Sequence, residues 1–242
     1  MSHRALSQEE FAALAAGDRA FEGMLFSSAL DLQAVDLSEA TFADCRFEPM
    51  RLASCKFGKA RFVGCSWFDA EQRKGCIFAF CDLHAAEIAK SNFATCSFER
   101  CDLYNLRATD TSFRGAQFGQ STFSRAISKR STLTKASFEN CNISFADLSG
   151  LFLPNGEFRS CKLSETSLID TDLTGATLIG CDLDRIDWER ANLAKADLCG
   201  SNLSGLKLAV LADYAGVMIS DSEQSEILGN LGVHVHSVSS RA

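Results

Sequence analysis

The side chains best able to do chemistry in this chain are eleven cysteines, four histidines and many aspartates. His234 and His236 would lie on one side of a strand as two metal ligands, but a pair without a third ligand favours packed or solvated imidazoles. The sequence contains no G-x-S-x-G, no glycine-rich phosphate loop and no H-E-x-x-H. We therefore predict that the chain is not an enzyme and holds neither a cofactor nor a metal.

Ten of the cysteines share one position, two residues before a large apolar residue. They are Cys45, Cys55, Cys65, Cys76, Cys81, Cys96, Cys101, Cys141, Cys161 and Cys181, and Cys199 alone departs from the pattern. No C-x-x-C pair exists, so the spacing does not indicate zinc. Parallel side chains and a reducing cytosol disfavour disulfides. We predict that these thiols are small, buried core residues.

The elements that position these side chains follow from a period of five. From Phe78 to Leu208 a large apolar residue recurs at every fifth position, with Ala108 and Ser128 as the exceptions. The residue two places earlier is nearly always small, and the one between is often Asp or Asn. A period of five fits neither helix nor strand, so the chain must turn once per repeat. The pattern predicts a solenoid whose aspartates hydrogen-bond the turns.

Residue type is also kept at every twentieth position, which predicts four repeats per coil. One predicted column is Phe78, Phe98, Phe118, Phe138, Phe158, Leu178 and Leu198, and the next is Leu83, Leu103, Phe123, Ile143, Leu163, Leu183 and Leu203. Members of a column would stack at the strand spacing of about 4.8 Å.

The period is broken once, between Trp67 and Phe78. An earlier block from Leu32 to Trp67 obeys the same rule, but this step is two repeats plus one residue. The intervening segment is polar, charged and ends in glycine, which predicts a loop that projects from the coil. From Ser124 to Thr134 the period continues with only Ser128 off pattern, which predicts a coil without a second loop.

The two ends differ from the repeats. Ser7 to Ala16 has a capping-box start and is followed by Gly17, which predicts a helix that caps the first coil. Ser220 starts a second capped segment that ends before Gly232. The last predicted element is a short strand through Val233, Val235 and Val238. We expect an N-terminal cap over 1–20, repeats over 21–210, and a C-terminal helix, strand and tail over 211–242.

The charge and hydropathy of the chain bound its partners. The formal net charge is −7, so the chain repels nucleic acid and favours basic partners, including proteins that themselves bind DNA. No apolar run approaches the roughly 20 residues of a membrane span, and the first residues lack the apolar stretch of a signal peptide. We predict a cytoplasmic protein with no membrane contact and no direct contact with nucleic acid.

Three passages resemble a known family. F-V-G-C-S-W-F-D at 62–69 with Q-R-K-G-C-I-F at 72–78 looks like the loop region of the Qnr quinolone-resistance proteins, which are pentapeptide-repeat proteins. I-D-W-E-R-A-N-L at 186–193 is similar to their late D-W-x-x-A-N-F segment, and 197–233 follows their closing repeats. The resemblance implies an all-β fold, a right-handed quadrilateral β-helix with short N-terminal and C-terminal helices.

The resemblance also implies a function. Qnr-type proteins are rod-like homodimers that imitate duplex DNA, bind DNA gyrase and topoisomerase IV, and relieve their inhibition by quinolones. The loop that would touch the topoisomerase is Phe68, Asp69, Ala70, Glu71, Gln72, Arg73, Lys74 and Gly75. The acidic face that would stand in for phosphates is Asp147, Asp170, Asp172, Asp182, Asp184, Asp187 and Asp197. The C-terminal dimer contact would be Tyr214, Val217, Ile219, Ile227, Leu228 and Leu231.

Two alternatives stay open at this point. Family members typically carry a second, longer loop, which the unbroken period from Ser124 to Thr134 does not predict here. Related proteins with fewer loops protect gyrase from other toxins, so the chain could be a self-immunity protein. It could also be a generic, non-enzymatic interaction scaffold, because the pentapeptide repeat occurs in many unrelated roles.

Overall fold

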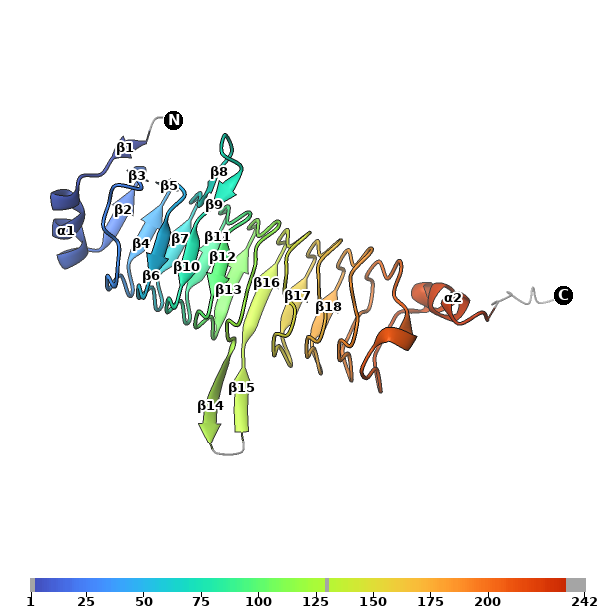
Figure 1. Cartoon of the computed structure of the whole chain (residues 1–242). Coiled ribbons are helices and arrows are strands. Elements are labelled where there is room, and N and C mark those ends of the chain that lie inside the picture. The colour runs from blue at the N-terminus through green and yellow to red at the C-terminus, as the bar shows by residue number, and fades with distance from the viewer. Residues whose placement is uncertain (1–2, 129–130, 234–242) are drawn as a thin grey trace.

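The computed structural model describes residues 3–128 and 131–233, which form a long rod with a helix at each end (Figure 1). The rod is a right-handed quadrilateral β-helix, in which the chain turns once per pentapeptide and each coil has four walls. We number the walls in chain order, so that one coil runs through Phe98 in wall 1, Leu103 in wall 2, Ala108 in wall 3 and Phe113 in wall 4. This confirms the solenoid that the period of five predicted.

Parallel pairing between coils builds the walls. Wall 1 contains β6 (Arg51–Ala53), β10 (Ile77–Ala79) and β12 (Ser97–Glu99), and wall 4 contains β1 (Arg4–Ala5), β3 (Met24–Phe26) and β5 (Arg46–Phe47). Wall 3 contains β2 (Ala20–Glu22), β4 (Thr41–Ala43), β7 (Arg61–Val63), β11 (Glu87–Ala89), β13 (Leu106–Thr109), β16 (Ala136–Glu139), β17 (Glu157–Arg159) and β18 (Thr177–Ile179). Wall 2 is held by isolated parallel bridges such as Asp82 to Asp102.

The large residue of each repeat fills the inside of the rod. Phe78 and Phe98 stack with ring centroids 5.0 Å apart and planes 7° apart, and Phe98 stacks on Phe118 in the same way. At the N-terminal end Phe42 lies between Phe21 and Phe62, 4.9 Å from each. These rings are almost completely buried. Side chains of the same type therefore stack in ladders in the first coils, as the spacing of about twenty residues predicted.

The predicted columns are wrong beyond Phe118. The next coil places Asp147 beside Gln117, so Leu148 rather than Phe138 continues the column of Phe118 in wall 1. Phe138 instead pairs with Ala108 in wall 3. The column of Phe123 is shifted in the same way, because Ile143 follows Phe113 in wall 4. An insertion of ten residues in one coil causes the shift, and it moves every later residue by half a turn.

That insertion is a second projection, which the sequence did not predict. β14 (Ser124–Ser128) and β15 (Ser131–Thr134) form an antiparallel hairpin that leaves the rod between walls 2 and 3 (Figure 1). The expectation of an uninterrupted coil over Ser124 to Thr134 is therefore wrong. Ten residues are two whole repeats, so the excursion leaves the five-residue period in phase. Only Ser128, small where a large residue was expected, signals it.

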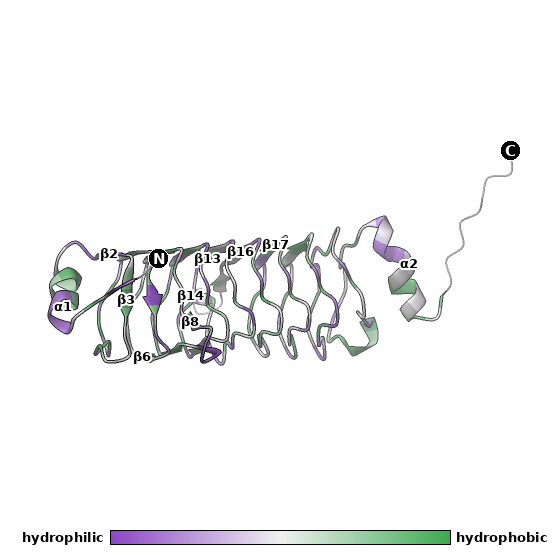
Figure 2. Ribbon diagram, turned by 90° about the horizontal axis from the view of Figure 1, so that it is seen from above, coloured by the Kyte–Doolittle hydropathy of each residue, from purple (hydrophilic) through white to green (hydrophobic). Residues whose placement is uncertain are grey.

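Both predicted helices form. α1 (Gln8–Ala16) is capped by the Ser7 hydroxyl, which accepts a hydrogen bond from the Glu10 amide at 3.2 Å. Its Phe11 packs on Phe21 and Phe26, and the helix lies at the N-terminal end of the rod, beside the first coil (Figure 2). α2 (Asp221–Asn230) begins with the capping box of Ser220 and Glu223, after a short 3-10 helix η1 (Leu208–Val210). The predicted strand beyond it, apart from Val233, lies outside the described residues.

The small position of each repeat carries the cysteines, and ten are buried as predicted while Cys199 is half-buried. The structure adds a role for the thiols. Cys161 donates to the Phe138 carbonyl at 3.4 Å, and Cys181 donates to the Phe158 carbonyl at 3.4 Å. In the same column, the Ser201 hydroxyl donates to the Leu178 carbonyl. Cysteine and serine thus do the same work here, which is to donate to a backbone carbonyl of the preceding coil.

The aspartates beside the core residues cap the turns. A carboxylate oxygen of Asp102 accepts the Tyr104 amide at 2.9 Å, and Asp172 accepts the Thr174 amide at 2.9 Å. Asp82 makes the same contact with the His84 amide at 3.0 Å. This confirms that the repeated acidic position stabilises the turns.

Candidate interaction surfaces

The loop predicted between Trp67 and Phe78 is a small hairpin that leaves the rod between walls 4 and 1. β8 (Phe68–Asp69) pairs antiparallel with β9 (Lys74–Gly75), and the four residues between them form the tip (Figure 1). The projecting side chains, all exposed, are Ala70, Glu71, Gln72, Arg73 and Lys74. Phe68 is half-buried, while Asp69 and Gly75 are buried at the base. The structure thus divides the predicted loop into an exposed tip and a structural base.

Asp69 holds the tip in shape. One carboxylate oxygen accepts the Gln72 and Glu71 amides, each at 2.9 Å, and the other pairs with the Arg46 guanidinium at 3.0 Å. The Gln72 amide, more than Arg46, holds the pKa of Asp69 below its usual value. Arg46 comes from the preceding coil and was not predicted. The sequence does contain an arginine one coil before the break, but Arg46 can be recognised as the partner of Asp69 only when the wall that carries Arg46 is known.

Gly75 fits the base of the loop for a steric reason. A Cβ at this position would lie 2.6 Å from both the Ala94 carbonyl oxygen and the Cys96 amide nitrogen of the next coil. Real Cβ atoms do not approach a backbone this closely, and backbone atoms cannot turn aside as a side chain can. The returning strand of the loop is therefore packed directly on the coil that follows it.

The hairpin β14–β15 is fixed to the rod by Arg125. Its guanidinium pairs with the Asp102 carboxylate at 3.1 Å and lies 4.9 Å from the centre of the Tyr104 ring. On the other side, the Ser124 and Thr134 hydroxyls are 2.8 Å apart. Leu133, which lies opposite Arg125, is 38% exposed, and Ile127 farther out is 65% exposed. The hairpin is thus clamped at its foot and presents apolar side chains to solvent.

The predicted acidic residues do not form one face. Wall 1 carries Asp147 and Asp187, with Asp170 in the turn that follows it. Wall 2 carries Asp172, wall 3 carries Asp197, and wall 4 carries Asp182 and Asp184. The prediction of a single acidic face is therefore wrong, since these residues occupy all four walls. These residues lie on different walls because five-residue steps between carboxylates move successive positions around the coil.

Ion pairs offset part of this charge. The Arg190 guanidinium donates to both carboxylate oxygens of Asp170, at 2.6 and 2.7 Å, and lowers the pKa of Asp170. Arg185 pairs with Asp184 at 2.9 Å and with Glu165 at 3.0 Å. By contrast, no basic partner is seen for Asp147, Asp172, Asp187 or Asp197 among the ion pairs of the described residues. The acidic character of the C-terminal half rests on these carboxylates.

The residues predicted to join two copies divide into exposed and packed groups. Tyr214 is 46% exposed and Leu231 is 53% exposed, and three apolar side chains that were not predicted lie in the same region. These are Val210, Met218 and Val233. Ile227 is buried, and Val217 and Ile219 pack against the core, while Leu228 is half-buried. The exposed group is available for contacts, and the packed group supports the last coil.

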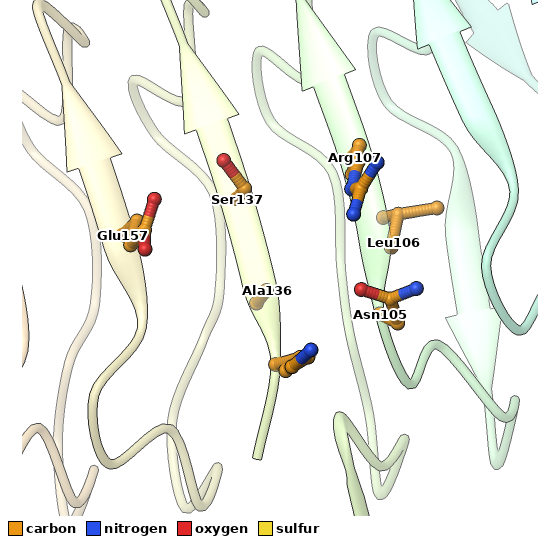
Figure 3. Close-up of a pocket in the computed structure, with 7 residues that line it drawn as sticks. Asn105, Leu106, Arg107, Ala136, Ser137 and Glu157 are labelled. Atoms are coloured by element: carbon orange, nitrogen blue, oxygen red, sulfur yellow. The ribbon is translucent and has the colours of Figure 1, made fainter.

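Wall 3 is hollowed near the foot of the hairpin. Three adjoining hollows of about 190, 290 and 420 Å³ share Arg107 as a lining residue. Lys135 and Asn105 line the one beside the hairpin (Figure 3). Arg61 and Glu87 line the two toward the N-terminus. Sequence reasoning missed this surface, because its residues come from five different coils.

The described residues offer neither a metal site nor a membrane-spanning helix. Within residues 3–128 and 131–233, no three His, Cys, Asp or Glu side chains gather as a metal site. The predicted pair His234 and His236 lies outside this part. None of the helices in the described part is long and apolar enough to cross a membrane.

The repeats identify the class of protein. Eight copies of the pentapeptide repeat match this chain, over residues 76–115, 111–150, 141–178, 155–187 and 178–208. The chain therefore belongs to the pentapeptide-repeat family, as the sequence predicted.

Within this family, the chain is similar in sequence to a Qnr protein. The quinolone resistance pentapeptide repeat protein QnrB96 of Scandinavium goeteborgense is 28% identical over 152 residues, which cover 59% of this chain and 66% of that protein. The match spans just under two thirds of this relative's length.

Solved structures share the fold. Full-length QnrB1, a plasmid-mediated fluoroquinolone resistance protein, superposes with a TM-score of 0.70 at 23% identity, covering 88% of this chain and 100% of QnrB1. HetL, a pentapeptide repeat protein involved in heterocyst differentiation regulation in the cyanobacterium Nostoc, gives a TM-score of 0.51 at 20% identity, covering 88% and 94%.

Proposed function

We propose that this chain binds the type II topoisomerases DNA gyrase and topoisomerase IV in the cytoplasm and protects them from quinolones. The observation that carries the proposal is the position of its two projections. An otherwise regular rod is interrupted by the loop 68–75 and by the hairpin 124–134, which leave from opposite corners. The hairpin supplies the second projection that Qnr-type proteins typically carry. The sequence similarity to a quinolone-resistance protein supports the same function.

The charge of the rod supports imitation of DNA. Carboxylates of the C-terminal half occupy all four walls, so negative charge surrounds the rod rather than lining one side. Duplex DNA also presents its phosphates around the whole helix axis. A protein surface that binds DNA through Lys and Arg could therefore accept this rod in several rotational settings.

We also propose that two copies join through their C-terminal ends. Tyr214 and Leu231, together with Val210, Met218 and Val233, leave an apolar surface exposed there. Exposed apolar groups gathered in one region are typical of protein interfaces. A dimer joined at this end would place the acidic halves of both copies at its centre.

A supercoiling assay tests the proposal directly. Gyrase is inhibited with ciprofloxacin, and the wild-type chain should restore supercoiling. Deletion of Asp69 to Lys74 brings Trp67 and Phe78 to the regular five-residue spacing, so the rod should still fold while protection is lost. The matched control is Arg100→Glu, a change to an exposed residue of wall 1 that leaves both projections intact. If the wild type gives no protection, the proposal is wrong. If the wild type protects and the deletion variant protects equally well, the loop is not the contact.

A second assay tests the charge. Replacing Asp172, Asp182 and Asp187 with Asn keeps an oxygen that can accept the turn amides, so the fold should survive. Binding to gyrase should weaken, and more at low salt than at high salt, because salt screens exposed charges. Equal loss at both salt concentrations would count against phosphate imitation.

A further inference from the structure

The coil that carries the hairpin is basic, although the chain as a whole is acidic. Residues 111–138 contain no Asp or Glu but include Arg114, Arg125 and Lys135, in a protein of net charge −7. Lys135 follows the hairpin directly, and its carbonyl accepts the Asn105 amide at 2.8 Å, which fixes it at the edge of wall 3. Positive charge is thus concentrated in this coil, at the point where the hairpin leaves the rod.

One of the hollows on wall 3 adjoins this coil, because Lys135 lines it together with Arg107 of the preceding coil. Parallel register sets Arg61, Glu87 and Arg107 in one outward row, which continues through Ser137 and Glu157. Five coils at about 4.8 Å give the row a length of about 19 Å, which fits about six residues of extended chain. Small residues make the surface concave, since Ala85, Ala89 and the buried Ala136 line it among longer side chains.

Only some of the positively charged side chains in this groove form ion pairs with carboxylates. Arg61 pairs with Glu87 at 3.4 Å, and Lys59 pairs with Glu39 at 3.0 Å. Arg107 and Lys135 are both exposed and make no ion pair with any other residue of the described ranges. The two unpaired cations line the same hollow, at the foot of the hairpin (Figure 3).

An apolar surface adjoins the cations. Leu133 lies opposite Arg125 in the hairpin, so both side chains are on one side of it, and Arg125 leans toward Tyr104 of the preceding coil. This side of the hairpin therefore faces the turn that carries Tyr104, next to Asn105 in the lining of the groove. Val63, which is 37% exposed, and Ala89 line the far part of the groove.

We propose that this groove binds an acidic, partly apolar segment of the topoisomerase, with its carboxylates on Arg107 and Lys135 and its apolar side chains on Leu133 and Val63. The inference rests on the proposed function and gives the chemistry of one contact. An arginine binds a carboxylate through two parallel hydrogen bonds. A protein segment fits better than DNA, because the chain as a whole is acidic and repels phosphates, while exposed leucine and valine favour an apolar partner.

Binding and cross-linking test the proposal together. A carbodiimide joins a lysine amine to a carboxylate at zero length, so the wild type mixed with gyrase should link Lys135 to Asp or Glu of a gyrase subunit, identified by mass spectrometry. Arg107→Glu and Lys135→Glu should each weaken gyrase binding at least about tenfold, since reversing one partner of a close charge pair costs this much or more. Arg100→Glu on the opposite wall is the matched control and should bind like wild type. Thermal unfolding of all three variants should match the wild type.

The outcomes separate this inference from the proposed function. If the wild type does not bind gyrase at all, the proposed function is wrong and this assignment of the partner falls with it. If the wild type binds and Arg107→Glu binds equally well, the groove alone is refuted. Cross-links from Lys135 only to a second copy of this chain would assign the groove to self-association. Binding of a fluorescent DNA duplex that Arg107→Glu abolishes would assign it to DNA, and either result overturns the acidic topoisomerase segment.

Discussion

The Arg46 guanidinium and the Asp69 carboxylate meet at 3.0 Å across two adjacent coils, and this pair ties the projecting loop to the rod. Asp69 is almost buried while Arg46 is 41% exposed, so the arginine covers the carboxylate from the solvent side. The other carboxylate oxygen holds the amides of the tip. One side chain therefore sets both the shape of the loop and its attachment.

We expect Arg46→Ala to loosen the loop without unfolding the rod, because the core residues are untouched. Limited trypsin digestion should cut faster after Arg73 or Lys74, while the thermal midpoint stays close to that of the wild type. Arg51→Ala, which removes an exposed ion pair with Glu99 on wall 1, is the control and should leave cleavage in the loop unchanged. Unchanged cleavage in Arg46→Ala would show that the tip amides alone hold the loop.

The same carboxylate predicts a pH dependence. Hydrogen bonds from the Gln72 and Glu71 amides and the charge of Arg46 lower the pKa of Asp69 in the folded protein. Its contribution is therefore fully present above the unfolded value of about 3.9 and is lost as the pH falls through the lower folded value. Hydrogen exchange of the Gln72 amide should be constant, after correction for intrinsic rates, from pH 8 to pH 5 and faster only below about pH 4. Asp69→Asn should remove this pH dependence.

Gly75→Ala should destabilise the protein by about 1–3 kcal/mol, the usual cost of an atom forced into a packed site. The added Cβ would meet backbone atoms of Ala94 and Cys96, which cannot move without displacing the next coil. Gly119→Ala is the matched control, since a Cβ there meets nothing within 4 Å. Urea unfolding of both variants measures the difference, and equal stabilities would show that the loop base yields easily.

The cysteines predict a labelling pattern. Burial raises the pKa of Cys76 to about 12, and the side chain of Cys199 alone among the eleven is half-exposed. A maleimide should modify Cys199 in the native protein and the other ten only after unfolding. A hydrogen bond with Asp197 raises the pKa of Cys199, so Asp197→Asn should speed its labelling at pH 7. Rapid labelling of several thiols in the native protein would mean that the coils open.

Much of the fold was predictable because the pattern of residue types within each repeat determines where the chain turns and which side chains face inward. A large residue, a small residue and a turn-capping aspartate in every five positions leave the chain one way to bury its core. The capping boxes at Ser7 and Ser220 marked both helices for the same local reason. Surfaces were less predictable, since residues such as Arg107 and Lys135 become neighbours only when the number of residues in each coil is known.

The two projections show why one was found and the other missed. From Leu52 to Phe78 a coil takes 26 residues, and from Ala108 to Phe138 it takes 30, whereas other coils take 20 or 21. Six extra residues shift a period of five by one, so the sequence displays the break. Ten extra residues are two whole repeats and leave the period unshifted. The hairpin was hidden because its length is a multiple of the repeat, and the same length makes it removable.

Deleting Ser124 to Leu133 should therefore leave an intact rod. Phe123 and Phe138 would then stand five residues apart with Ala136 in the small position, as in every regular repeat. Stability should change by less than about 1 kcal/mol, because a shorter connection only lowers the entropy cost of closing the coil. Deleting one residue more, Ser124 to Thr134, leaves a wall too short to place Phe138 inside and should cost at least about 3 kcal/mol, as loss of a buried phenylalanine does. Urea unfolding compares the two deletions, and equal stabilities would contradict the assignment of the hairpin as an in-phase insertion.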